Sequence, residues 1–132
     1  MESVDIITNL TPVDFEKKFD RLFKKYYGML YEGSLITANQ VVVGSAFVVK
    51  SKPYFEEKIT KYILPLEKFP LPTKECRNIL KGKAITAFDK YFDQIKSKNE
   101  VIDFVKKELK NTRNATKNKA VKFLRKWGDK QV

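Results

Sequence analysis

The feature that most constrains this sequence is a segment that occurs twice. Residues 77 to 91, RNILKGKAITAFDKY, return 36 positions later as residues 113 to 127, RNATKNKAVKFLRKW, with six of fifteen positions identical. Self-similarity at a period of about 20 to 50 residues is typical of proteins in which similar units stack on one another. The repetition therefore predicts a chain built of stacked repeats.

The charge of the chain is strongly positive and unevenly placed. The 132 residues fit one domain, spanning 1–132, and carry a net charge of +11. Residues 67 to 132 hold eighteen Lys and Arg against eight Asp and Glu. A field of this sign favours phosphate backbones, anionic membranes or acidic proteins as partners.

The rare residue types exclude several kinds of chemistry. One cysteine and no histidine exclude an intrachain disulfide, a Cys/His zinc site and a histidine general base. We therefore expect no metal, no cofactor and no enzymatic activity. The sequence shows no signal peptide and no apolar run of about 18 residues, so we expect a cytoplasmic protein that does not insert into a membrane.

Helical signals divide the first third of the chain. Thr11 and Pro12 are typical of a helix start, and apolar residues from Phe15 to Leu30 recur at helical spacing until Gly33. Residues 35 to 50, LITANQVVVGSAFVVK, fit either a helix or a hairpin of two strands. We favour the helix, because no other segment offers a partner strand and a buried helix can be apolar on all sides.

A second pair of helices follows Pro53. Residues 54 to 68 repeat the apolar spacing of the first helix, and Pro65 should end this helix near Leu64. Thr73 is the predicted cap of the longest helix, residues 74 to 95. Its predicted inner face consists of Leu80, Ala84, Ala87, Phe88, Tyr91 and Ile95.

A third pair completes the chain. Ser97 and Glu100 form a capping-box pattern before a short helix with an apolar side of Val101, Val105 and Leu109. Thr112 is the predicted cap of the last helix, which should end at Gly128. Its predicted inward residues are Thr116, Ala120, Phe123, Leu124 and Trp127.

The repeat length and the helix pairs resemble the HEAT-repeat class of helical solenoids. The second helices share small residues at 44–46, 82–84 and 118–120, which would let neighbouring helices approach closely. The resemblance, which includes uncharacterised prokaryotic HEAT-like proteins, implies an all-α, right-handed αα-superhelix. It would contain about three hairpins, over residues 11–52, 53–96 and 97–128. Whether the chain is part of a longer array stays open.

Cations recur along the second helices, which line the concave surface in HEAT-like stacks. The repetition aligns Arg77 with Arg113 and Lys83 with Lys119. The candidate binding residues are Arg77, Lys81, Lys83, Lys90, Arg113, Lys117, Lys119, Lys122, Arg125 and Lys126. The alternative is that these charges only keep a polar outer surface soluble.

Two functions fit such a surface. The first is a scaffold that binds an acidic partner protein, in its groove or at the helix around Val41 to Val49. The second is a sequence-nonspecific binder of nucleic-acid backbone. The resemblance to HEAT-repeat DNA alkylation repair glycosylases supports nucleic-acid contact. Base excision is in doubt, because this chain is about half as long and has a single tryptophan.

Other candidate residues favour structural roles. Trp127 lies on the apolar side of the last helix, so we expect it in the core. Cys76 should be an inert buried thiol, and Asp89 with Asp93 should lie on a solvated face rather than form a catalytic pair. The tyrosines at 26, 27 and 31 are expected in the core or at its rim.

Overall fold

The computed structural model describes residues 16 to 128, and this part of the chain contains helices and no strand. Its α-helices are α2 (Glu16–Gly28), α3 (Leu35–Ser51), α4 (Glu56–Ile63), α5 (Lys74–Tyr91), α6 (Lys98–Lys107) and α7 (Asn114–Trp127). Short 3-10 turns adjoin them: η2 (Met29–Tyr31), η3 (Pro53–Phe55), η4 (Leu66–Lys68), η5 (Phe92–Gln94) and η6 (Glu108–Lys110). The all-α prediction is confirmed for these residues. The helix start predicted at Thr11 lies outside them.

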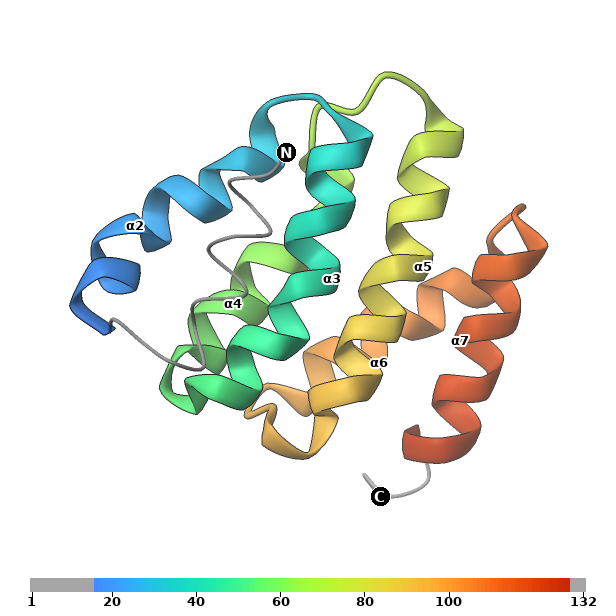
Figure 1. Ribbon diagram of the computed structural model, residues 1–132. Coiled ribbons are helices and arrows are strands. Elements are labelled where there is room, and N and C mark those ends of the chain that lie inside the picture. Colours follow the sequence, from blue (N-terminus) through green and yellow to red (C-terminus); the bar gives the residue numbers. More distant parts are fainter. Residues whose placement is uncertain (1–15, 129–132) are drawn as a thin grey trace.

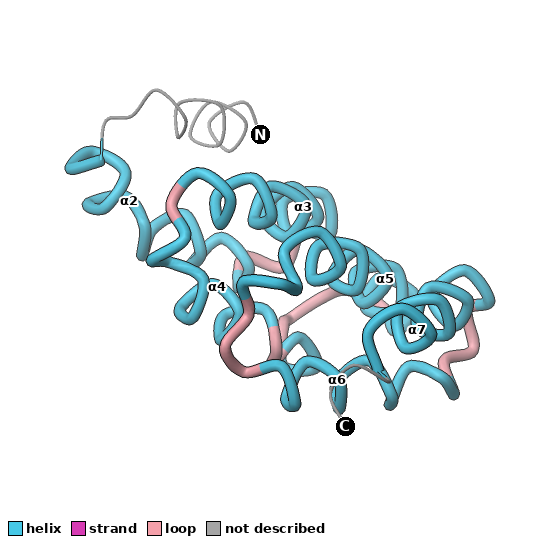
Figure 2. The backbone as a smooth tube through the Cα atoms, turned by 90° about the horizontal axis from the view of Figure 1, so that it is seen from below, coloured by secondary structure: helices cyan, strands magenta, loops and turns pink. Residues whose placement is uncertain are grey.

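The helices lie in two layers. In Figure 1, α3, α5 and α7 run side by side, with α5 packed between the other two; we call them the odd layer. Figure 2 shows α2, α4 and α6 on the other side of the core, and we call them the even layer. Apolar rings join the layers. Phe88 of α5 meets Phe104 of α6 at 5.7 Å between ring centroids.

Residues 35 to 51 form a helix, so the hairpin alternative is wrong. Ser34 caps it, because its hydroxyl accepts a hydrogen bond from the Thr37 amide at 3.2 Å. Gly33, the residue before Ser34, has a φ of 88°, a left-handed conformation that favours glycine. Ser45 of α3 is fully buried and shares a 2.9 Å hydrogen bond with the hydroxyl of Tyr27 in α2.

The second pair matches its sequence signals closely. α4 ends at Ile63, ahead of Pro65, and the turn η4 follows. Thr73 caps α5, since its hydroxyl accepts from the Cys76 amide at 3.1 Å. α5 ends at Tyr91 and not at the predicted residue 95, so Ile95 is buried beyond the helix, after the turn η5. The other predicted inner-face residues are all buried within α5: Leu80, Ala84, Ala87, Phe88 and Tyr91. These residues fix the orientation of α5 about its axis.

Two predicted caps in the third pair are wrong. Ser97 precedes α6, but its hydroxyl makes no capping hydrogen bond, and Glu100 is exposed. Arg113, not Thr112, is the N-cap residue of α7. The hydroxyl of Thr112 instead accepts from Asn78 of α5 at 3.4 Å.

The inward residues of α6 and α7 are mostly as expected. Val101 and Val105 are fully buried, whereas Leu109 is 37% exposed because it lies in the turn η6 beyond the regular helix. On α7, the buried residues are Thr116, Ala120, Phe123 and Trp127, while Leu124 is half-buried.

α5 and α7 approach closely at Gly82. A methyl group at this position would lie 3.0 Å from the Thr116 hydroxyl oxygen of α7. That hydroxyl donates to the carbonyl of Asn78 at 2.7 Å, so it is held in place. The absence of a side chain at Gly82 therefore sets the distance between the two helices, as its place in the small-residue pattern predicts.

Candidate functional site

The ten cations predicted as a binding ladder do not lie on one surface. Phe88 of α5 contacts α6, so this side of α5 faces the even layer. Arg77 and Lys81 lie eleven and seven residues before Phe88, within about 20° of it around a regular helix. Lys83 and Lys90 lie about 140° and 160° away from Phe88. The structure therefore turns two of the four cations inward and two outward.

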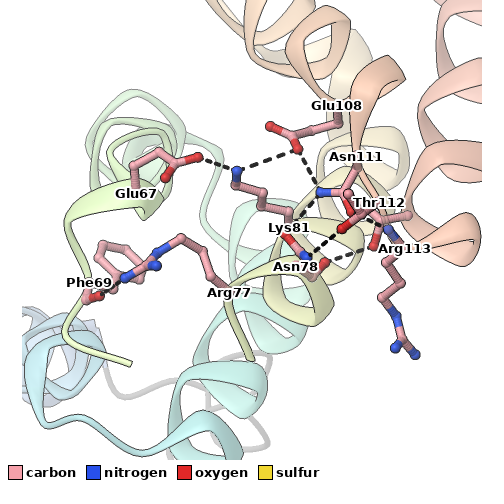
Figure 3. Close-up of polar contacts among 10 residues, drawn as sticks. Glu67, Phe69, Arg77, Asn78, Lys81, Glu108, Asn111, Thr112 and Arg113 are labelled. Atoms are coloured by element: carbon pink, nitrogen blue, oxygen red, sulfur yellow. Dashed lines mark hydrogen bonds and ion pairs between the residues drawn. The ribbon is translucent and has the colours of Figure 1, made fainter. Parts of the chain in front are cut away.

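Arg77 is tied to the loop that precedes its own helix. Its side chain is half-buried, and its Nη2 donates a hydrogen bond to the carbonyl oxygen of Phe69 at 3.1 Å (Figure 3). Phe69 is itself fully buried. Arg77 thus holds the connection between α4 and α5 against the start of α5.

Lys81 lies between two carboxylates. Its Nζ forms ion pairs with Glu67 and with Glu108, the latter at 3.5 Å (Figure 3). The side chains of Lys81 and Glu108 are only 11% and 6% exposed, whereas that of Glu67 is 65% exposed. Because η4 and α5 belong to the second helix pair and η6 belongs to the third, this triad joins the second pair to the third.

A polar network continues from the triad towards α7. Asn111 donates from Nδ2 to Glu108 at 3.0 Å and to the side-chain oxygen of Asn78 at 3.2 Å (Figure 3). The Asn111 side-chain oxygen accepts from the amide of Arg113 at 2.8 Å, at the start of α7. The hollow beside this network has a volume of about 230 Å³. Its inner polar groups already have partners within the chain.

Three hydrogen-bonded pairs between α5 and residues 113 to 127 join residues 38 apart, not 36. Arg113 pairs with Glu75 at 2.6 Å, and the indole N–H of Trp127 donates to Asp89 at 2.7 Å. The odd-layer helices begin at residues 35, 74 and 114, which are 39 and 40 apart. Residues that are 36 apart in the sequence repetition therefore do not occupy equivalent positions in α5 and α7, and their positions along the two helices differ by about one turn. Arg77 is the fourth residue of α5, while Arg113 is the N-cap of α7.

Five lysines share the outward side of α5 and α7, which we call the basic face. On α5, Lys83 is half-buried and Lys90 exposed; on α7, Lys119 is half-buried while Lys122 and Lys126 are exposed. The spacing of the three α7 lysines, i, i+3 and i+7, places them on one side of that helix. The basic face thus crosses the boundary between the two helices.

Lys119 lies at the centre of this cationic cluster. Partial burial lowers the pKa of Lys119 below its ordinary value, and the neighbouring cations Lys83 and Arg113 lower it further. A hollow of about 170 Å³ opens beside it between α5 and α7. Its lining residues are Ile85, Thr86, Asp89, Lys119, Lys122, Phe123 and Lys126. An anion at this point would relieve the repulsion between the cations.

Asp89 is the acidic group in this hollow, and it is engaged. Besides the Trp127 indole, Asp89 pairs with Lys126 at 3.2 Å. Lys126 in turn lies 5.0 Å from the centre of the Trp127 ring. The remaining predicted cations, Lys117 and Arg125, are exposed but lie on other sides of α7.

The other candidates take structural positions. Trp127 is buried and packs against Phe92 at 4.7 Å between ring centroids, so the prediction of a core role is confirmed. Tyr26 and Tyr27 are fully buried, and Tyr31 is 46% exposed at the rim. The thiol predicted to be buried, Cys76, is only half-buried.

An exposed apolar stripe on α3 is only weakly indicated by the sequence. The side of α3 that carries Ser45 faces α2 of the even layer, since Ser45 bonds to Tyr27. Ile36, Val43 and Phe47 lie within about 20° of the opposite direction. Their exposed fractions are 65%, 46% and 40%. The helical spacing of residues 36, 43 and 47 was the available signal, but the all-round apolar composition of the helix concealed it.

Comparison with protein-family models, curated proteins and solved structures finds no match for this chain. Within residues 16 to 128, no helix is long and apolar enough to cross a membrane. The same residues hold no group of three or more Cys, Asp and Glu side chains suited to a metal ion.

Proposed function

We propose that the chain is a HEAT-like helical-repeat binding module, without enzymatic activity, that presents the basic face to an acidic partner protein. Two observations support the HEAT-like assignment: the helices alternate between two layers, and the odd-layer helices start 39 and 40 residues apart. A right-handed superhelix and a cytoplasmic location belong to the same proposal.

The observation that carries the proposed function is the cationic cluster around Lys119. The pKa of Lys119 is lowered first by partial burial and further by the nearby cations Lys83 and Arg113, and no residue of α7 is acidic. Arg77 and Lys81 are excluded from the proposed surface because they have inward partners, and Arg113 is excluded because it pairs with Glu75. Lys117 and Arg125 are excluded because they lie on other sides of α7. The surface that remains consists of Lys83, Lys90, Lys119, Lys122 and Lys126.

A binding titration with poly-glutamate tests the proposal. The triple variant Lys119→Ala/Lys122→Ala/Lys126→Ala should bind at least tenfold more weakly than the wild type, because each exposed charge pair contributes up to about 1 kcal/mol. The control removes the same charge from exposed even-layer positions, in Lys58→Ala/Lys68→Ala/Lys106→Ala. The control should change affinity less than threefold.

Equal losses in the two triple variants would overturn the proposal, since net charge alone would then explain binding. Duplex and single-stranded oligonucleotides are titrated in parallel at low and moderate salt. Tighter binding of either nucleic acid than of poly-glutamate, with a steep dependence on salt, would favour the backbone-binding alternative instead.

A further inference from the structure

The outward surface of the odd layer combines two kinds of side chain. The stripe of Ile36, Val43 and Phe47 on α3 points away from the even layer, as do Lys83 and Lys90 of α5. The helices α3 and α5 pack directly against each other. Apolar side chains and cations are thus next to each other on one continuous surface. Most exposed apolar side chains of a protein lie singly, whereas these three lie on the same side of one helix.

The axial spacing on the two helices is the same. Ile36 and Val43 are seven residues apart on α3, and Lys83 and Lys90 are seven residues apart on α5. Seven residues are two helical turns, or about 10.5 Å along the axis. A partner helix repeats its own side chains at that distance. An extended chain does not, because its side chains on one face recur about every 6.8 Å.

The width of the surface also suits a helix. Neighbouring packed helices lie about 8 to 10 Å apart, and a helix with its side chains is about 10 to 12 Å across. A helix laid along the line where α3 and α5 meet is therefore wide enough to touch both. The stripe from Ile36 to Phe47 extends for about 17 Å, or three turns of such a partner.

From this juxtaposition we propose that the acidic partner is an amphipathic α-helix of about three to four turns. Its apolar side lies on Ile36, Val43 and Phe47 of α3. Carboxylates at i and i+7 on its adjacent side pair with Lys83 and Lys90 of α5. This assignment rests on the proposed function, and it adds the conformation of the partner and an apolar half of the contact.

The test uses a designed helical peptide with leucines along one side and glutamates along the flank. A scrambled peptide of the same composition is the control, and circular dichroism establishes that only the first is helical. The protein should bind the amphipathic helix at least tenfold more tightly than the scramble. The variant Val43→Ser/Phe47→Ser, which changes exposed residues only, should lose about tenfold in affinity for the helix.

The same variant should bind poly-glutamate as the wild type does, because the polymer uses only the lysines. A matched control, Leu109→Ser, removes another partly exposed apolar side chain and should bind the helix normally. Lys83→Ala/Lys90→Ala should weaken binding of both ligands.

Two results would overturn this inference while leaving the proposed function intact. One is equal affinity for the helix and the scramble; the other is normal helix binding by Val43→Ser/Phe47→Ser. Stronger binding to anionic phospholipid vesicles than to the helix would also overturn it, in favour of a lipid surface. Failure of the wild type to bind poly-glutamate and both peptides would refute the proposed function as well.

Discussion

Replacing Lys81 by methionine should reduce the free energy of unfolding by about 3 kcal/mol at neutral pH. Methionine keeps most of the aliphatic part of the side chain, so the substitution removes mainly the ammonium group between Glu67 and Glu108. Removing one partner of a buried ion pair costs about 3 to 5 kcal/mol, because the other charge stays buried without compensation. We take the lower end, since Asn111 still donates a 3.0 Å hydrogen bond to Glu108.

Urea unfolding followed by far-ultraviolet circular dichroism measures this loss. With a denaturant slope of about 1.5 kcal/mol per molar, the midpoint should fall by about 2 M. Glu67→Gln is the control, because the Glu67 side chain is 65% exposed and its contact with Lys81 should contribute at most about 1 kcal/mol. The difference between the two variants depends on burial rather than on charge.

The double variant Lys81→Met/Glu108→Leu removes both charges but keeps most of the side-chain volume. Replacing a whole buried pair by apolar groups is often nearly neutral, so the double variant should recover most of the stability lost by Lys81→Met. A single variant within about 0.5 kcal/mol of the wild type would refute this reasoning. So would a double variant as unstable as the sum of its single changes.

Three further predictions follow from buried contacts. Gly82→Val should lower the unfolding free energy by about 1 to 3 kcal/mol in urea, because its side chain would meet the held hydroxyl of Thr116. Burial raises the pKa of Tyr91, so its neutral phenol stabilises the fold below about pH 10 and the contribution is lost above that pH; Tyr91→Phe should show a shallower alkaline loss in pH-dependent unfolding. Asp89→Ala should cost about 1 kcal/mol by removing an acceptor of the Trp127 indole, as followed by tryptophan fluorescence during unfolding.

The helices themselves could be predicted because each depends on many residues. α3 is a helix although it is rich in valine, since eight of its side chains are buried and the described residues offer no strand to pair with. The ends before Pro53 and Pro65 follow from proline geometry alone. Such signals do not depend on the three-dimensional neighbours of a single residue.

The two wrong caps depend on those neighbours. Ser97 has a backbone ψ of 55°, outside the extended region in which a cap side chain reaches back to the helix, and its hydroxyl makes no hydrogen bond. Thr112 is drawn instead to Asn78, which lies 34 residues away in the chain. A tertiary donor such as Asn78 cannot be predicted from a local motif, and neither can the backbone conformation that keeps the Ser97 hydroxyl from capping α6.

The inward direction of Arg77 and Lys81, by contrast, can be predicted from the spacing of residues in the sequence. Residues 77, 81, 84, 88 and 91 follow the i, i+4, i+7, i+11, i+14 spacing of one helical side, and the last three are the apolar residues that define the core. The alignment of the repeats matches identical cations and does not take this helical spacing into account. A cation on the buried side of an amphipathic helix requires a carboxylate or carbonyl partner, as Glu108 and Phe69 provide. A cation on the opposite side requires no partner from the fold. Lys83 and Lys90 are therefore lysines of α5 whose charge is available to another molecule, and their position relative to the apolar side identifies them.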